Sequence, residues 1–241
     1  MSLGAVDFVL DSENFEEVLR IFEELGLWLE LARFDATEVF SSYDVEVRSV
    51  QAYKLHELSI VSPHRKERIA AVEHIKEKIE LASRIEAKRV VTVPAYGYSH
   101  AVNARQICMN SFRELADYAS DCGVGIAIEA LSPRRTSFLP CLREVIALVK
   151  DIDRENVYAM ADTMHIHDAG EDVAEVIAEY SAEIAELHLK DTESLPPGKG
   201  RINFQQFLTQ GLNVDLCLEY SGGGDAALKE AVSFIKSLLS R

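Results

Sequence analysis

The stretch from residue 156 to residue 191, NVYAMADTMHIHDAGEDVAEVIAEYSAEIAELHLKD, decides the fold of this chain. It opens on a short apolar run, continues through an amphipathic segment and closes on a second short apolar run. This succession predicts a strand, a helix and a second strand parallel to the first, joined by a right-handed crossover. Parallel strands are covered by helices on their faces, so a single unit of this kind needs further units beside it.

The same alternation extends outward over the whole chain. Most of the short apolar runs in the 241 residues precede an amphipathic helix candidate. Eight such units in roughly 250 residues predict an α/β fold, a (β/α)₈ TIM barrel, and no linker-like stretch divides residues 1–241, so we expect a single domain. An open doubly wound sheet would carry a glycine-rich nucleotide loop after an early strand, and none occurs. The expected strands are 5–10, 27–34, 52–60, 89–97, 125–133, 156–167, 184–191 and 213–224, and residues 35–50 form the one unit without a clean helix.

Composition and charge narrow the class of protein. The chain is 48% hydrophobic and has a net charge of −15, which disfavours binding to nucleic acid or to anionic membranes. No apolar run reaches the length of a membrane span, and the first residues lack the basic start of a signal peptide. The four cysteines show no Cys-x-x-Cys spacing and are expected to be free thiols. We therefore expect a cytoplasmic protein, and the sequence leaves open whether it forms a homo-oligomer.

Strand periodicity predicts four polar side chains on the inside of the barrel. Successive side chains of a strand point to opposite faces, so the aliphatic phase should pack under the helices and the other phase should face inward. Taken singly, an aspartate at a strand end is typical of a helix cap, and an inward histidine is typical of a hydrogen-bonded core. Here the inward residues lie near the carboxyl ends of four consecutive strands, where barrel active sites are built. They are Glu129, Asp162, His188 and Glu219.

Taken together, these four side chains favour a divalent metal site. Adjacent strands lie about 4.8 Å apart, so inward side chains on neighbouring strand ends can reach one ion. Three buried carboxylates would otherwise repel one another and lose their hydration. Ligation by oxygen atoms with one nitrogen suits Mn²⁺, Mg²⁺ or Co²⁺, and Zn²⁺ also accepts it.

Four motifs between residues 123 and 224 point to a known family: IAIEALSP, MADTMHIHDAGED, ELHLKDTESLPPGKGRINF and LCLEYSGG. With them the chain resembles the xylose-isomerase-like barrel superfamily, in its branch of sugar phosphate isomerases, epimerases and endonuclease IV. The resemblance implies that the four inward residues hold one divalent metal ion. It also implies that Glu129 and Glu219 act as an acid–base pair and that His165 contacts the substrate.

The activity implied by the resemblance is the isomerisation or epimerisation of a sugar, or of a sugar phosphate. One glutamate would remove the proton beside a carbonyl, and an enediolate would form before a proton returns. A keto-inositol dehydratase shares this first step and is an alternative. A DNA-repair enzyme like endonuclease IV is another, but the additional histidines of its three-zinc site are missing. A non-catalytic barrel that binds a polyol or a partner protein is the third alternative.

Several residues around the expected site are candidates for substrate binding. Two lie near inward strand ends, and two are the cations that follow the seventh strand. Including the histidine named above, the expected substrate-binding residues are His165, His56, Glu30, Lys190 and Arg201.

Two loops have a functional and an ordinary interpretation that the sequence leaves open. The loop SPRRTSF, residues 132–138, either supplies Arg134 or Arg135 to an anionic substrate or is simply solvated. The glycines at 222–224 either bind a phosphate at a helix start or form a flexible turn.

Overall fold

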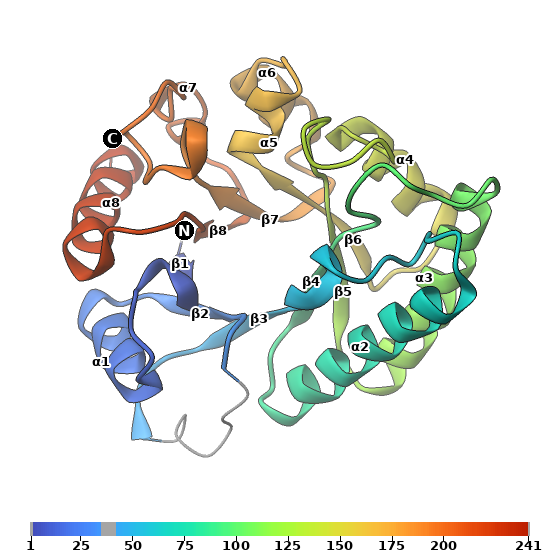
Figure 1. The fold of residues 1–241 in the computed structure, drawn as a ribbon. Helices are drawn as coiled ribbons and strands as arrows, with labels where there is room; N and C mark the ends of the chain where they lie inside the picture. Colours follow the sequence, from blue (N-terminus) through green and yellow to red (C-terminus); the bar gives the residue numbers. More distant parts are fainter. Residues whose placement is uncertain (1, 35–41, 241) are drawn as a thin grey trace.

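The computed structural model describes residues 2–34 and 42–240, and its strands close into one barrel (Figure 1). Every strand pairs in parallel with its neighbours in chain order, and the last strand pairs with the first. The predicted (β/α)₈ TIM barrel is confirmed. The strands are β1 (Leu3–Val6), β2 (Trp28–Leu31), β3 (Val47–Gln51), β4 (Arg89–Thr92), β5 (Gly125–Glu129), β6 (Val157–Asp162), β7 (Ile184–Leu189) and β8 (Asp215–Leu218).

The helices surround the strands and return the chain from one strand to the next (Figure 1). None of the described helices is long and apolar enough to cross a membrane. Three short 3₁₀ helices, η1 (Asp7–Val9), η3 (Tyr53–His56) and η4 (Thr192–Ser194), follow β1, β3 and β7. The α-helices are α1 (Phe15–Leu25), α2 (Arg65–Arg84), α3 (Ala104–Asp121), α4 (Leu142–Ile152), α5 (Thr163–Asp168), α6 (Val173–Tyr180), α7 (Gln205–Leu208) and α8 (Gly224–Leu239).

The third strand lies earlier in the chain than the sequence predicts. Residues 52–60, which were expected to form it, contain η3, and the strand itself is β3 at Val47–Gln51. The prediction was wrong because β3 carries the polar side chains of Ser49 and Gln51 on its inward face, which interrupts the apolar run that would mark a strand. Residues 35–41, within the unit that lacks a clean helix in the sequence, lie outside the described residues.

The predicted alternation of the strands between two faces is confirmed. On β5, Ile126 and Ile128 belong to the large apolar core between the strands and the helices. The residue between them, Ala127, packs instead with Val91 and Met160 inside the barrel. Glu129, two residues after Ala127 on the same face of β5, therefore points inward at the carboxyl-terminal end of the barrel.

Trp28 fills the amino-terminal part of the barrel interior. It packs there with Val6 and Cys217, and its indole nitrogen donates a hydrogen bond to the carbonyl of Ser2 at 3.3 Å. The neighbouring strand allows this only because it has glycine at position 4, where a Cβ atom would collide with the indole ring. Side chains thus fill the amino-terminal part of the barrel, which also holds the ion pair of Arg89 and Asp215, the first residues of β4 and β8.

Candidate active site

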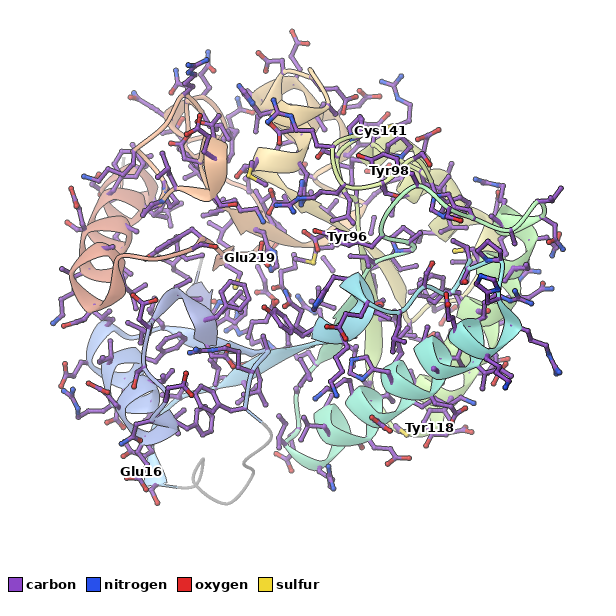
Figure 2. The ribbon with its side chains drawn as sticks, in the orientation of Figure 1. Glu16, Tyr96, Tyr98, Tyr118, Cys141 and Glu219 are labelled. Carbon is purple, nitrogen blue, oxygen red and sulfur yellow. The ribbon has the colours of Figure 1, made fainter. Side chains whose placement is uncertain are left out.

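Four side chains from consecutive strands meet at the carboxyl end of the barrel. Glu129 and Asp162 end β5 and β6, His188 is the penultimate residue of β7, and Glu219 directly follows β8. One potential ligand atom from each lies within 4.8 Å of the others, and all four residues are buried. Figure 2 shows Glu219 toward the middle of the barrel, whereas Glu16 lies on the outer surface of α1. The four residues that the sequence analysis singled out therefore form one cluster.

Asp162 is both a helix cap and a member of this cluster. Its Oδ1 accepts a hydrogen bond from the backbone amide of His165 at 2.9 Å. Asp162 is therefore the N-cap residue of α5. Its Oδ2 has no partner of hydrogen-bond geometry among the described residues and lies 2.9 Å from Nζ of Lys190. The interpretation as a helix cap is therefore confirmed for Oδ1, and Oδ2 faces the cluster.

The ammonium group of Lys190 lies among the carboxylates. Lys190 directly follows β7, is 8% exposed, and forms ion pairs with Asp162 and Glu219. Burial by itself would lower the pKa of Lys190, but the charges of Asp162 and Glu219 raise it above its usual value. Without a bound ion, Lys190 is therefore a cation at neutral pH that offsets the charge of these carboxylates.

The two glutamates of the cluster differ in protonation. Burial, followed by the charge of Glu219, raises the pKa of Glu129 to about 8. Burial would raise the pKa of Glu219 as well, but the charges of Lys190 and His188 hold it well below its usual value. At neutral pH and without a bound ion, Glu129 keeps its proton and Glu219 is ionised. Two carboxyl groups whose pKa values are pushed apart are the usual signature of an acid and a base.

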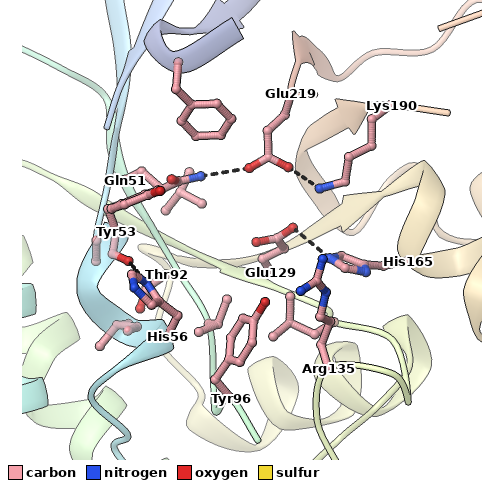
Figure 3. Close-up of a pocket in the computed structure, with 16 residues that line it drawn as sticks. Gln51, Tyr53, His56, Thr92, Tyr96, Glu129, Arg135, His165, Lys190 and Glu219 are labelled. Carbon is pink, nitrogen blue, oxygen red and sulfur yellow. Dashed lines mark hydrogen bonds and ion pairs between the residues drawn. The ribbon is translucent and has the colours of Figure 1, made fainter. Parts of the chain in front are cut away.

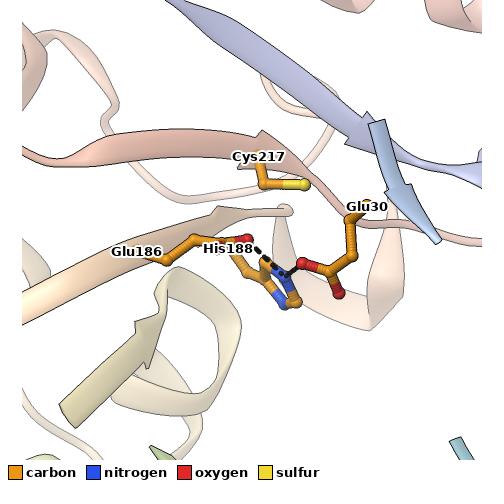
Figure 4. Close-up of side chains that lie close together, drawn as sticks. All are labelled: Glu30, Glu186, His188 and Cys217. Carbon is orange, nitrogen blue, oxygen red and sulfur yellow. Dashed lines mark hydrogen bonds and ion pairs between the residues drawn. The ribbon is translucent and has the colours of Figure 1, made fainter. Parts of the chain in front are cut away.

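The ring of His188 joins this cluster to a layer below it. Its Nδ1 lies 3.2 Å from Oε2 of Glu219 and has no hydrogen-bond partner among the described residues. Its Nε2 lies 3.2 Å from Oε2 of Glu30, on the opposite side of the ring (Figure 4). Burial would lower the pKa of His188, but the charges of Glu219 and Glu30 raise it well above its usual value. With Nε2 donating to Glu30, it is the loss of the other ring proton that would turn an Nδ1 lone pair toward the upper cluster.

The lower layer is a fully buried polar network. Burial would raise the pKa of Glu186, but the proximity of His188, whose Nε2 lies 3.7 Å from Oε1 of Glu186, and the charge of Arg89 lower it to about 2. Glu186 accepts hydrogen bonds from Ser49 at 2.5 Å and from Arg89 at 3.0 Å. Oε2 of Glu186 thus has two protein donors, whereas Oε1 has no hydrogen-bond partner among the described residues. Because Arg89 already supplies a positive charge here, we assign this layer to the support of His188 and not to a second ion. Its members within 4.8 Å of one another are Glu30, Glu186, His188 and Cys217 (Figure 4).

A cavity of about 460 Å³ lies against the upper cluster (Figure 3). Glu129, Lys190 and Glu219 contribute to its wall, and the loops that follow β1, β3, β4 and β5 enclose the rest. The volume is within the range of small-molecule sites, and the mixed lining is typical of them. The remaining lining residues are Phe8, Gln51, Ala52, Tyr53, Leu55, His56, Val91, Thr92, Val93, Tyr96, Leu131, Arg135 and His165.

Three of the five expected substrate-binding residues line this cavity: His165, His56 and Lys190. His165 is buried, and its Nε2 lies 4.0 Å from Oε1 of Glu129. Burial lowers the pKa of His165 to about 4, so its ring is neutral at physiological pH. His56 reaches the cavity from η3 and not from a strand end, and its Nδ1 donates to the carbonyl of Tyr53 at 2.7 Å.

The other two expected substrate-binding residues lie away from the cavity. Glu30 is fully buried below His188 and is not among the lining residues. Arg201 is exposed and also lies outside the lining. Its loop is folded onto Asp191, whose carboxylate accepts hydrogen bonds from the amides of Gly198 and Ile202, each at 3.0 Å. These contacts, which join residues 7 and 11 positions apart, leave no periodic signal in the sequence.

Gln51 is a site residue that the sequence analysis missed. Its Nε2 donates to Oε1 of Glu30 at 3.0 Å and to Oε1 of Glu219 at 3.1 Å, so it links the two layers. Gln51 ends β3, the strand that was placed too late in the chain. The alternation in VRSVQ, with Ser49 and Gln51 in one phase, is the signal that could have found it.

The residues present fit a divalent cation. The cluster offers three carboxylates and one imidazole, and two of its buried atoms, Nδ1 of His188 and Oδ2 of Asp162, lack hydrogen-bond partners among the described residues. The other ring nitrogen of His188 is held by a carboxylate, as is common for metal-bound histidine. Because Lys190 contacts the same oxygens, an ion bound here would share them with its ammonium or displace it.

Comparison with known proteins places the whole barrel in one family. The family model described as xylose isomerase-like TIM barrel matches residues 5–238. The crystal structure of a 3-keto-D-glucoside 4-epimerase from E. coli superposes with a TM-score of 0.86 at 16% identity, over 98% of this chain and 99% of that chain. A zinc-bound IolI protein superposes with a TM-score of 0.78 at 19% identity, over 100% and 98%. At these identities the superpositions show the fold.

A relative with a named activity matches a shorter part. A D-psicose 3-epimerase from Agrobacterium fabrum is 29% identical over 92 residues, which cover 38% of this chain and 32% of that epimerase. The matched region thus spans about a third of the length of the curated relative.

Proposed function

This chain belongs to the xylose isomerase-like TIM barrel family, and from that premise we propose that it is a divalent-metal-dependent sugar isomerase or epimerase. The observation that carries the proposal is the convergence of Glu129, Asp162, His188 and Glu219 at the wall of a cavity of sugar-binding size. The named activities of relatives support it, since they include D-psicose 3-epimerase, L-ribulose 3-epimerase and inosose isomerase.

The cation would be held by the three carboxylates and by Nδ1 of His188. When bound, it would act as a Lewis acid that polarises a substrate carbonyl and acidifies the neighbouring C–H group. Mn²⁺, Mg²⁺, Co²⁺ and Zn²⁺ all suit this donor set, and the zinc-bound structural neighbour supports zinc as one of them.

The chain's own residues would move the proton. Glu219 is ionised and would accept the proton of the substrate carbon at a carboxylate oxygen. The proton would return to the neighbouring carbon or to the opposite face from Glu219 itself or from Glu129, which would first take up a proton from the substrate hydroxyl or from solvent. General acid–base catalysis of this kind contributes about 10²–10⁴-fold to the rate.

The other groups at the cavity would hold the substrate and exclude water. Lys190 would neutralise the negative charge that builds up beside Glu219 and would offer N–H donors to substrate oxygens. Neutral His165 can donate or accept a hydrogen bond to a hydroxyl group. Phe8 and Leu131 supply apolar surface against the carbon skeleton of a sugar.

The test combines metal content with proton exchange. Elemental analysis of protein purified without chelators should find about one divalent ion per chain, and a Glu129→Ala/Glu219→Ala variant should lose it. In D₂O the metal-loaded protein should exchange a carbon-bound proton of its ketose substrate, which NMR detects. A variant at an exposed glutamate, Glu230→Ala, is the control. A protein that binds no divalent ion even after Mn²⁺, Co²⁺ and Zn²⁺ are added would overturn the proposal.

A further inference from the structure

Two adjacent arginines in the loop after β5 are directed differently. Arg134 lies at the surface, where its Nη1 is 3.5 Å from Oδ1 of Asp168 and its side chain is 73% exposed. Arg135 lines the active-site cavity, and Figure 3 shows its side chain rising beside Tyr96 toward His165 and Glu129. Both arginines are exposed, but Arg135 is the one that lines the cavity.

The guanidinium of Arg135 has no protein partner. Among residues 2–34 and 42–240, no carboxylate lies within ion-pair distance of it and no side-chain hydrogen bond involves it. The other cation of the cavity, Lys190, is already paired with Asp162 and Glu219. Arg135 is thus the cation of the described cavity lining whose hydrogen-bonding capacity is still open to a ligand.

The backbone around Arg135 is held in place before any ligand arrives. Its carbonyl accepts a hydrogen bond from the amide of Gly97 at 2.8 Å, and the next residue, Thr136, forms a β-bridge with Gly97. The hydroxyl of Tyr98 donates to the carbonyls of Pro133 and Arg134 at 3.0 and 2.7 Å. A cation carried on a tied loop loses little freedom when it binds, which favours a recognition role over that of a solvated surface arginine.

From these observations, and resting on the proposed function, we propose that Arg135 binds an anionic group of the substrate, so that the substrate class is a sugar phosphate or a sugar acid. Guanidinium presents paired N–H donors that match the oxygens of a carboxylate or a phosphate. The glycines at 222–224, which the sequence left as an alternative phosphate site, are not among the residues that line the cavity. The loop after β5 is therefore the favoured place for the anion.

The test compares three forms of one ketose: the neutral sugar, its terminal phosphate and the corresponding terminal carboxylate. Steady-state kinetics are measured on the metal-loaded protein and on Arg135→Gln, with Arg134→Gln as the matched control from the same loop. Arg135→Gln should raise KM for one anionic form about 10- to 100-fold and change KM for the neutral sugar far less, because the charge-assisted hydrogen bonds form only with the anion. The form with the larger change identifies phosphate or carboxylate as the natural group.

Other outcomes overturn the inference. A wild-type protein that prefers the neutral sugar, or an Arg135→Gln variant that affects all three forms equally, would show that Arg135 does not recognise an anion. Arg135→Lys separates charge from shape: it should restore part of the affinity, whereas a purely structural defect would not be rescued. Circular dichroism checks that each variant is folded.

Binding without turnover distinguishes this inference from the proposed function. If no form exchanges deuterium with the wild-type protein, the proposed isomerase activity fails. Calorimetric titration of the metal-loaded protein with inorganic phosphate and with the sugar phosphate then decides the anion site alone. Binding that weakens at least tenfold in Arg135→Gln supports it, and no binding to the wild-type protein overturns it.

Discussion

Glu219 is a buried carboxylate with polar partners on several sides. It contacts Lys190 and His188, accepts a hydrogen bond from Gln51, and stays ionised although it is buried. We predict that Glu219→Gln lowers the rate of solvent deuterium exchange into substrate by at least about 10²-fold, because the amide cannot accept the proton. NMR of the substrate in D₂O measures the rate, and circular dichroism checks the fold. A variant that exchanges at the wild-type rate would rule out Glu219 as the base.

Glu30 lies behind His188 and does not line the cavity. A hydrogen bond from Nε2 of His188 to Oε2 of Glu30 orients the ring so that Nδ1 faces the upper cluster. We predict that Glu30→Gln weakens metal binding about 10- to 100-fold, because the amide no longer favours that tautomer. Calorimetric titration of the ion-free protein with Mn²⁺ measures the affinity. If the affinity is unchanged in a folded variant, Glu30 has only a packing role.

At this scale, the sequence predicts the residues that follow strand periodicity and misses those that depend on loops. The clustering of Glu129, Asp162, His188 and Glu219 follows from one rule about which side of a strand a residue faces. Arg201 was misplaced because the fold of its loop depends on hydrogen bonds to Asp191 from residues that are not neighbours in sequence.

The loop between β7 and α7 is organised around the carboxylate of Asp191. Asp191 is fully buried, and its carboxylate accepts backbone hydrogen bonds from Thr192, Gly198 and Ile202. We predict that Asp191→Ala destabilises the fold by about 2–4 kcal/mol, because three charge-assisted hydrogen bonds are lost. Urea denaturation measures the loss, and hydrogen exchange should quicken at the amides of Gly198 and Ile202.

The matched control for this prediction is Asp191→Asn. An asparagine retains the Oδ1 acceptor for Thr192 and Ile202 and loses only the bond from Gly198. Its stability should lie between those of the wild-type protein and Asp191→Ala. Equal stability of all three proteins would mean that the loop is ordered by other contacts.

The strands themselves were predictable where apolar residues occupy both faces. β5 and β6 are such strands, since small and aliphatic side chains fill the barrel interior there. β3 was missed because it carries Ser49 and Gln51 inward, where they serve the polar layers of the site. A strand that builds a polar interior loses the apolar signature by which strands are recognised.

Across the whole molecule, the four thiols should differ in reactivity. Cys108 and Cys217 are buried, whereas Cys122 and Cys141 are partly exposed. Burial raises the pKa of the Cys108, Cys141 and Cys217 thiols, so the difference in reactivity follows from access to the reagent. We predict that iodoacetamide at pH 8 alkylates Cys122 and Cys141 first and leaves Cys108 and Cys217 protected until the protein unfolds. Mass spectrometry of timed digests measures each rate. Equal rates for all four thiols in the folded protein would contradict the burial of Cys108 and Cys217.

The overall architecture was the most predictable property of the chain. Each strand–helix unit is encoded locally by apolar runs and amphipathic segments, and right-handed crossovers then allow few arrangements of eight parallel strands. The closure of β1 against β8 is non-local, and it follows from the number of units and not from any one motif.

The ammonium of Lys190 affects the ion-free state of the protein. Because Lys190 already offsets the negative charges of Asp162 and Glu219, we expect the chain to fold without a divalent ion. On the proposed function, molecules made when the ion is scarce would be folded but inactive, and each would become active once an ion binds. On the same premise, supply of the ion would then set how many of the folded copies are active.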